Sequence, residues 1–561
     1  MNQTSLRLFF RTPLCSAFAG AALGLPLVAS AQALPDAGRA LESLEQRRPA
    51  PPAPAPIDLR VPDGPAASSA DGGTRIEVQR FALDGNTAIA TPELLTLLAP
   101  LAGQSLPLSE LEAGVARITQ RYRELGYPFA YAYLPAQTVD AGTLRVAVIE
   151  GRLGAVRVEN ASRQRGAVIA APLARLTPGE LLRADTLERS LLLLGDASGL
   201  RAEATLQPGA ALGTSDLVVK VEDVPLFSGA LGADNFGNRY TGAWRATGSL
   251  QLNGALGLGE QIQLQTLVTH EDLYNYRLGY QMPLAPWSTR IGASLSHLDY
   301  ALDEEFGALD AYGSAKVASV HVTQPLLRSR GMNLNARLQY DHKRLIDHLG
   351  LYATNEHKRS HLATLALDGN WQDSMGGRAV SQWSLAWVHG QLRLGSPAQQ
   401  QRDAQTARSA GSFQLLTASL ARWQAGSGPW SLHGRINGQW SRSNLDSSEK
   451  MSLGGANGVR AYPQGEASGD QGLLGTLELR YALDGNWQLS GFVDAGKVKF
   501  QHRPWNAASN HRSLHGAGIG LQRNGADWSM ETSLAWRVAS SAATSAPDKR
   551  PRLWVKAQKH F

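Results

Sequence analysis

The spacing of apolar and polar residues changes character near residue 224. Beyond that point, apolar and polar residues alternate, for example along 333–340, 430–440 and 527–537. A period of two is typical of a β-strand with one apolar and one polar face. The polar face carries Arg and Glu, which a membrane barrel places in its wet lumen. About sixteen such segments, at about 21 residues per strand plus connection, match the length of tilted membrane strands. A soluble all-β protein is the alternative.

The last segment supports the barrel interpretation. Leu553, Val555, Ala557, Lys559 and Phe561 share one face of the strand, and the chain finishes on an aromatic residue. This ending resembles the recognition signal by which the barrel assembly machinery handles outer-membrane barrels, although Lys559 is atypical. We therefore expect the assembly machinery and the outer-membrane lipid among the partners of the chain.

Before residue 224 the apolar spacing is partly helical. Residues 75–152 predict a unit in the order β-α-α-β-β, with its first strand spanning Ile76 to Phe81, Pro92 in the first turn of a helix, and Gly126 ending the second helix. Residues 153–224 repeat this order, so we expect two tandem copies of one α+β module. In the second copy the expected strands are 155–158, 201–207 and 216–222, and the expected helices are 167–175 and 183–194.

The first 33 residues have the features of a cleavable signal peptide. Arg7 and Arg11 precede an apolar stretch, 14–28, and small residues follow it. An uncleaved anchor is the alternative. The single cysteine, Cys15, lies in this segment, so disulfides and cysteine metal sites are excluded from the mature chain.

Residues 34–48 predict a short helix, with Asp36 as N-cap and Leu41 and Leu44 on one face. A Pro-rich linker, 49–74, follows it. Because isolated helices of this length are marginal in water, the helix must dock elsewhere to be stable.

The amino-acid composition narrows the range of possible functions. Charged residues are 18% of the chain, and the net charge of +6 is spread along it, which favours a mildly basic pore and gives no sign of nucleic-acid binding. Four histidines (His342, His348, His357 and His361) fall around one expected loop without metal-like framing. We predict no metal, no cofactor and no enzymatic activity.

One loop, 442–472, carries the most specific motif. It is rich in glycine and contains Gly458, Val459, Arg460 and Tyr462. On the strand that follows, alternation directs Asp494 into the lumen, where a carboxylate seeks a cation and a guanidinium offers bidentate geometry. We expect an Arg460–Asp494 tether that folds the loop into the barrel. The alternative is that Asp494 is one more solvated lumen charge.

Together these motifs resemble the TpsB transporters of two-partner secretion, the ShlB/FhaC/HecB type related to BamA. The resemblance covers essentially the whole mature chain, although the loop motif has Ala461 where the family usually has Gly. The matching positions are a first-module signature (Gly126, Tyr127, Pro135, Gln137, Glu150 and Gly151), a first barrel hairpin (234–242), the loop motif (Gly458, Val459, Arg460 and Tyr462) and a wall motif (Phe492, Asp494 and Gly496).

The resemblance implies a membrane all-β fold. It consists of a 16-stranded antiparallel transmembrane β-barrel (225–561) after two periplasmic α+β POTRA domains (75–152 and 153–224) and an N-terminal plug helix. It further implies an outer-membrane transporter that exports a large partner exoprotein of haemolysin or adhesin type. The POTRA domains would recognise the N-terminal secretion domain of that partner. A BamA-like assembly factor is the alternative, and a diffusion porin would leave the two modules unexplained.

Overall fold

The computed structural model describes residues 35–45, 59–60, 75–285, 288–538 and 542–561. The expected signal peptide and most of the expected linker lie outside these residues. Among the described residues, no helix combines the length and the apolar character needed to cross a bilayer.

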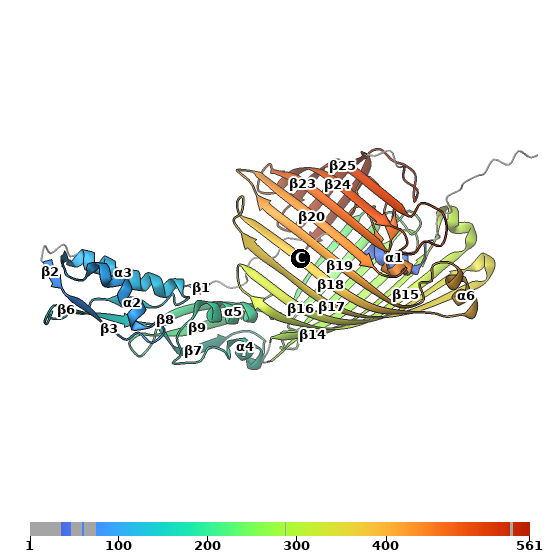
Figure 1. The fold of residues 1–561 in the computed structure, drawn as a ribbon. Coiled ribbons are helices and arrows are strands. Elements are labelled where there is room, and N and C mark those ends of the chain that lie inside the picture. Colours follow the sequence, from blue (N-terminus) through green and yellow to red (C-terminus); the bar gives the residue numbers. More distant parts are fainter. Residues whose placement is uncertain (1–34, 46–58, 61–74, 286–287, 539–541) are drawn as a thin grey trace, which may run out of the picture. The chain divides into compact units, whose positions relative to one another are not determined.

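The C-terminal part is a closed antiparallel barrel (Figure 1), in which the first strand pairs with the last through Ala230 and His560. Its sixteen strands confirm the predicted fold class. They are β10 (Phe227–Asp234), β11 (Arg245–Asn253), β12 (Gln261–Thr269), β13 (Tyr274–Leu284), β14 (Thr289–Ala301), β15 (Ala311–Arg328), β16 (Met332–Leu349), β17 (Thr354–Asp373), β18 (Ala379–Leu394), β19 (Gly411–Ala425), β20 (Trp430–Ser441), β23 (Gln471–Ala482), β24 (Trp487–Lys499), β25 (His511–Asn524), β26 (Trp528–Arg537) and β27 (Arg552–His560).

The two faces of the barrel wall differ as the alternation predicts. Leu338, Trp440 and Trp528 are 57%, 49% and 47% exposed on the outer face, whereas Asp341 and Arg435 on the inner face are buried. Apolar side chains left open to the outside suit a lipid environment, and the polar residues are kept in the lumen.

The first α+β module has a three-stranded sheet in the order β3-β6-β5 and a separate β2–β4 pair. The predicted single strand from Ile76 to Phe81 is therefore wrong. The chain is divided at Gln79, whose N–H bonds Gly142 O, because β2 pairs with a short strand that the sequence pattern did not reveal. The elements are β2 (Arg75–Val78), β3 (Arg80–Asp84), α2 (Thr91–Leu98), η1 (Ala99–Leu101), β4 (Gln104–Pro107), α3 (Leu108–Glu124), β5 (Tyr131–Tyr133) and β6 (Thr143–Ile149).

The second module has a four-stranded sheet in the order β1-β8-β9-β7. Strand β1 (Leu59–Arg60) comes from the expected linker and pairs in parallel with β8, so this part of the linker is a strand rather than a spacer. A free sheet edge offers unpaired backbone groups, which an extended segment can satisfy. The other elements are β7 (Arg152–Asn160), α4 (Gly166–Leu173), α5 (Ala184–Gly195), β8 (Leu200–Pro208) and β9 (Thr214–Asp223).

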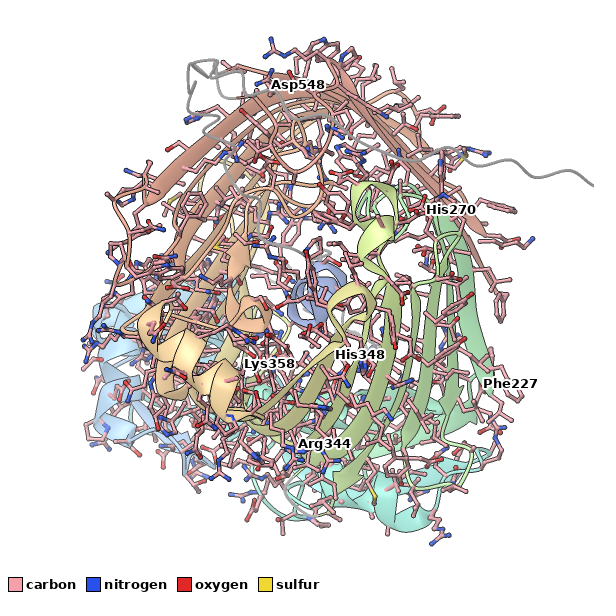
Figure 2. The ribbon with its side chains drawn as sticks, turned by 90° about the vertical axis from the view of Figure 1, so that its right-hand side faces the viewer. Phe227, His270, Arg344, His348, Lys358 and Asp548 are labelled. Carbon is pink, nitrogen blue, oxygen red and sulfur yellow. The ribbon has the colours of Figure 1, made fainter. Side chains whose placement is uncertain are left out.

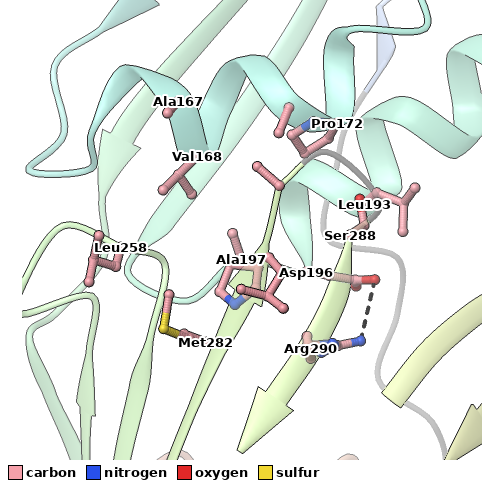
Figure 3. Close-up of a pocket in the computed structure, with 14 residues that line it drawn as sticks. Ala167, Val168, Pro172, Leu193, Asp196, Ala197, Leu258, Met282, Ser288 and Arg290 are labelled. Carbon is pink, nitrogen blue, oxygen red and sulfur yellow. Dashed lines mark ion pairs between the residues drawn. The ribbon is translucent and has the colours of Figure 1, made fainter. Parts of the chain in front are cut away.

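The second module contacts the barrel at the start of β14 and the end of β15. Asp196 accepts two hydrogen bonds from Arg328, at 2.7 and 2.9 Å, and lies 3.8 Å from Arg290. Beside this ion pair, α4, α5 and the β13–β14 turn enclose an apolar cavity of about 210 Å³ (Figure 3). These contacts identify the end of the barrel that faces the modules.

The lumen holds the N-terminal helix α1 (Ala37–Glu45), which Figure 2 shows surrounded by the strands. Shorter elements lie in the loops: η2 (Glu304–Leu309), η3 (Gly350–Tyr352), α6 (Pro397–Gln405), η4 (Ser447–Glu449), β21 (Met451–Ser452) and β22 (Ser468–Gly469).

Candidate functional site

The loop between β20 and β23 enters the barrel and places Arg460 against the wall. The Arg460 side chain is 2% exposed, and Asp494 on β24 is equally buried. The guanidinium donates from Nε to Oδ2 and from Nη2 to Oδ1, both at 2.9 Å, and the backbone N–H of Arg460 donates to Oδ2 at 3.1 Å. This is a bidentate, charge-assisted pair, which fixes direction as well as distance.

Further groups surround the same guanidinium. Its Nη1 lies 3.3 Å from Glu478 Oε2 on β23, and its Cζ lies 3.1 Å from the centre of the Phe492 ring. Thr476 donates a further hydrogen bond to Asp494 at 3.0 Å. Arg480 also pairs with Glu478 at 3.0 Å, so two cations offset two carboxylates in this buried cluster. Balanced charge and satisfied hydrogen bonds are what a buried ion pair needs to be tolerated.

The loop motif packs tightly around the ion pair. Val459 and Tyr462 are fully buried, and they form an apolar cluster with Phe492. A Cβ at Gly458 would collide with the Leu453 carbonyl oxygen, and a Cβ at Gly496 would lie 2.9 Å from the Leu453 side chain. Close approach to backbone therefore requires glycine at position 458, whereas a side chain at position 496 would require the Leu453 side chain to shift.

Glycines on β25 make room for this packing. A Cβ at Gly516 would lie 2.7 Å from the Ala461 Cβ, and one at Gly518 would collide with the Phe492 ring. Because Ala461 is itself buried against the wall, its methyl group occupies space that Gly516 leaves open.

Two further anchors are not foreseen from the sequence. The Trp554 indole on β27 donates to the Arg460 carbonyl at 2.7 Å. Glu466, fully buried, accepts from the N–H groups of Thr544 and Ser545 at 2.9 and 2.8 Å and pairs with Arg512. An acidic residue in a Gly-rich loop is the sequence feature that points to an anchoring contact, but the sequence alone does not indicate which strands provide its partners.

Helix α1 is held in the lumen at its N-terminus. Asp36 Oδ1 accepts from the N–H of Arg39 at 3.0 Å, which makes Asp36 the N-cap, and its Oδ2 accepts from Ser447 at 2.6 Å and from Lys358 on β17 at 2.9 Å. The first helical N–H donates to Asp347 on β16 at 2.7 Å. The cap therefore also serves as the docking contact.

Apolar packing also holds one face of the helix. Leu41 is 4% exposed and Leu44 packs beside it. Gly38 lets the helix approach the lumen loop, because a Cβ there would lie 2.6 Å from the backbone nitrogen of Ser448. The buried residues of this cluster outside the helix are Leu298, Tyr300, Ala311, Ala315 and Leu345 on the wall strands and Tyr240, Leu273 and Leu302 in the loops.

Glu150, one residue of the first-module signature, is buried. Its carboxylate accepts from the N–H groups of Thr87 and Ala88 and from the Tyr122 hydroxyl, at 2.6 to 2.7 Å. Burial alone would raise the pKa of Glu150, but these hydrogen bonds outweigh it and hold the pKa below its ordinary value. Gly151 follows with φ of 70°, where a Cβ would press on Phe129.

The remaining signature residues also have framework contacts. Gln137 bonds both backbone groups of Arg145, at 2.7 and 2.8 Å, and its amide lies 3.3 Å from the Pro135 carbonyl. Gly126 ends α3 with φ of 88°. Tyr127 lies under Arg183 of the second module, with 5.4 Å between the guanidinium and the ring centre, and so connects the two modules.

Comparison with known proteins agrees with this architecture. The haemolysin secretion/activation protein family ShlB/FhaC/HecB matches residues 213–523, and the ShlB-type POTRA domain matches residues 76–151. The heme/hemopexin transporter protein HuxB of Haemophilus influenzae (strain 86-028NP) is 28% identical over 515 residues, 89% of this chain and 91% of that protein. The outer membrane transporter CdiB of Escherichia coli O6:K15:H31 is 24% identical, over 86% and 85% of the two chains.

The fold has a solved counterpart. The structure of CdiB from Escherichia coli superposes with a TM-score of 0.69 at 19% identity, covering 89% of this chain and 93% of that one. The matches define an outer-membrane transporter, with the barrel in the outer membrane and the POTRA domains in the periplasm. The chain belongs to the ShlB/FhaC/HecB family of haemolysin secretion/activation proteins, whose members are transporters.

Proposed function

We propose that the barrel exports one large exoprotein, of haemolysin or adhesin type, through a lumen that α1 closes at rest. The lumen loop stays anchored during export, and α1 leaves. This proposal rests on the position of α1 in the lumen. Its docking contacts come from two wall strands and from the lumen loop. A helix in this place obstructs the path of a translocating chain, so its release is a condition for transport.

Recognition of the exoprotein is assigned to the POTRA domains. In the first module, β3 and β5 are the outer strands of the sheet, and in the second module β7 is an outer strand. An extended segment of the exoprotein can add to such an edge, with backbone bonds giving affinity and side-chain pockets giving register. Folding of the exoprotein outside the cell would then supply direction.

A haem- or hemopexin-binding exoprotein is a second candidate for the cargo. The observation that favours it is the 28% identity to HuxB over nearly the whole chain. Both candidates use the same lumen and differ only in which secretion domain the POTRA domains accept. During biogenesis, the barrel assembly machinery and outer-membrane lipid are the further partners that we propose.

Secretion from a deletion strain tests the function. The exoprotein encoded next to this gene should reach the medium when the full chain is supplied and should stay inside without it. The total content of other outer-membrane barrels is measured in the same cells. Secretion that is independent of this chain, together with reduced barrel content after its depletion, would contradict export and favour a BamA-like assembly factor.

A further inference from the structure

Four basic side chains form an unbroken row on the outer face of the barrel, across β15 to β18. The strand register pairs Lys316 with Arg344, Arg344 with Arg359, and Arg359 with Arg393. All four side chains are exposed and have the same parity as the lipid-facing residues of their strands, for example Leu338 on β16. We call these four residues the basic row.

The basic row is electrostatically unfavourable by itself. Residues directly opposite each other on neighbouring strands have their Cβ atoms about 5 Å apart, and like charges there destabilise the pair. None of the four forms an ion pair with a carboxylate in the part of the chain that the structure describes; Arg344 Nε instead contacts His342 at 3.1 Å. The nearby outer-face carboxylate, Asp299 on β14, is 2.7 Å from His297. The charge is thus left for an external anion.

The height of the row on the barrel identifies its surroundings. Arg328, which contacts the second module, marks the periplasmic end of β15, and Lys316 lies twelve positions before it in the same strand. At about 3.3 Å per residue and a tilt of about 40°, the row lies about 30 Å from that end. An apolar band of about 25 Å therefore ends just below it. Directly below the row, the outer-face positions are Ala318, His342, His361 and Gln391. The exposed apolar side chains of the band begin four to six positions below the row and include Val320, Leu338, Tyr340, Leu365 and Trp387.

The row lies close to the extracellular end of its strands. Arg344 lies five residues before the end of β16, and the hairpin there leads through η3 into β17, away from the end that contacts the modules. Arg344 and His348 are labelled on these strands in Figure 2. The basic row is therefore at the boundary between the acyl chains and the head groups of the outer leaflet.

We propose that the basic row is a binding site for the phosphate groups of the phosphorylated glycolipid in the outer leaflet. Three of its four members are arginines, whose planar guanidinium matches phosphate oxygens bidentately. With strands about 4.8 Å apart, the four charges span about 14 Å, enough to meet more than one phosphate of a head group. Acyl chains of the same lipid cover the apolar band below, so one ligand satisfies both features.

Lipid retention tests this site directly. Full-length protein is reconstituted in phosphatidylcholine nanodiscs that contain lipopolysaccharide, and retained glycolipid is counted by native mass spectrometry. The variant Lys316→Gln, Arg344→Gln, Arg359→Gln, Arg393→Gln should retain roughly tenfold less than wild type. Lipopolysaccharide with its phosphates removed should be retained equally and weakly by both proteins.

A matched control comes from β24. Lys497 is also an exposed outer-face cation near the extracellular end of its strand, but its register partners, Leu473 and Ser513, are uncharged. Lys497→Gln should therefore retain glycolipid like wild type. Equal retention by wild type and the fourfold variant would overturn the proposal, as would an equal loss in Lys497→Gln.

Stability gives an independent readout that separates binding from a structural role. In detergent without glycolipid, the fourfold variant should unfold at the same temperature as wild type or higher, because like charges have been removed. In nanodiscs that contain the glycolipid, wild type should unfold at a higher temperature than the fourfold variant. A variant that is less stable in both media would contradict the proposal. Reduced secretion with unchanged lipid retention would also contradict it, and would assign the row to the exported protein.

Discussion

The two elements in the lumen are held by the same kind of chemistry but differ in how many groups fix them. At the loop, Arg460 meets Asp494 through three hydrogen bonds, two from its guanidinium and one from its backbone N–H. The guanidinium also contacts a second carboxylate and an aromatic ring, and the Arg460 carbonyl accepts a hydrogen bond from Trp554. At α1, the N-cap Asp36 accepts from Ser447 and Lys358, and apolar packing holds one face of the helix.

This difference explains how one element can stay while the other leaves. The loop is joined to β20 and β23 at its two ends, so releasing it would break a buried ion pair and expose charged groups, at a cost of about 3–5 kcal/mol. The N-cap of the helix, Asp36, pairs with Lys358, which also pairs with Asp446 at 2.9 Å and so keeps a partner after the helix departs. The lumen residues that contact the helix are thus suited to reversible docking.

The largest effect is expected from Arg460→Ala. Removal of the guanidinium leaves Asp494 buried without its cation, so the loop should detach and secretion should fall roughly a hundredfold or more, as expected for a loss of about 3–5 kcal/mol. Heat-modifiable migration on gels checks that the barrel still inserts. The swap Arg460→Asp, Asp494→Arg should recover part of the activity, limited by Glu478, which then faces an aspartate. Normal secretion by Arg460→Ala would contradict the anchor.

A smaller effect is expected when the helix is loosened. Asp36→Ala removes both the N-cap and the ion pair to Lys358, a loss of about 1–3 kcal/mol. We expect single-channel conductance to rise, with open events about five- to 150-fold more frequent, while secretion is retained. The control is Ser43→Ala, since the Ser43 hydroxyl donates within the helix to Ala40. A closed channel in Asp36→Ala would show that the polar end does not hold the helix.

The first POTRA domain provides a comparison outside the lumen. Glu150→Gln leaves some of the donors around the carboxylate unmatched, so the unfolding free energy of this domain should fall by about 1–3 kcal/mol. Because the folded pKa is below the ordinary value, the stabilisation from ionised Glu150 is complete above the ordinary pKa and is lost as pH falls through the folded pKa. Stability of the wild type should therefore decline in acid more than that of Glu150→Gln.

The control for this substitution lies on the same domain. Glu93 pairs with Arg121 at 2.7 Å, but both side chains are largely exposed, so Glu93→Gln should change stability by less than about 1 kcal/mol. Proteolysis of the POTRA domain at pH 7 and at pH 4 measures both variants. Equal sensitivity of the two would contradict the buried role of Glu150.

The smallest effect is expected from Trp554→Phe. The substitution removes the hydrogen bond to the Arg460 carbonyl, worth about 1 kcal/mol, and keeps an aromatic ring near Phe236. Secretion should stay within about twofold of wild type, with slightly faster protease cleavage in the loop. A loss as large as that of Arg460→Ala would mean that the backbone bond, rather than the guanidinium, anchors the loop.

The sequence predicts the barrel well because a two-residue period is a direct consequence of having one lipid face and one wet face. It also directs Asp494 into the lumen by the same rule. Alternation gives no register between strands, however, so it cannot place Glu478 opposite Phe492 or bring Trp554 to the loop.

In the POTRA region too, the sequence does not predict which distant strands pair. Strand β4 follows a 3₁₀ turn and has little alternation of its own, so its pairing with β2 is visible only in the fold. Likewise, the alternation identifies Lys358 and Asp347 only as charges that face the lumen. Their role depends on contact with α1, which lies more than 300 positions away in the sequence. Such contacts depend on tertiary structure rather than on local propensity.

A reversible lock on the helix tests the central claim most directly. Asp36→Cys and Ser447→Cys replace two side chains that are 2.6 Å apart, and the chain has only one other cysteine, Cys15, in the expected signal peptide. Secretion by this double variant is measured before and after reduction, beside each single variant. The account predicts that secretion is blocked while the disulfide is closed and restored when it is reduced. Full secretion with the disulfide closed would show that α1 does not have to leave.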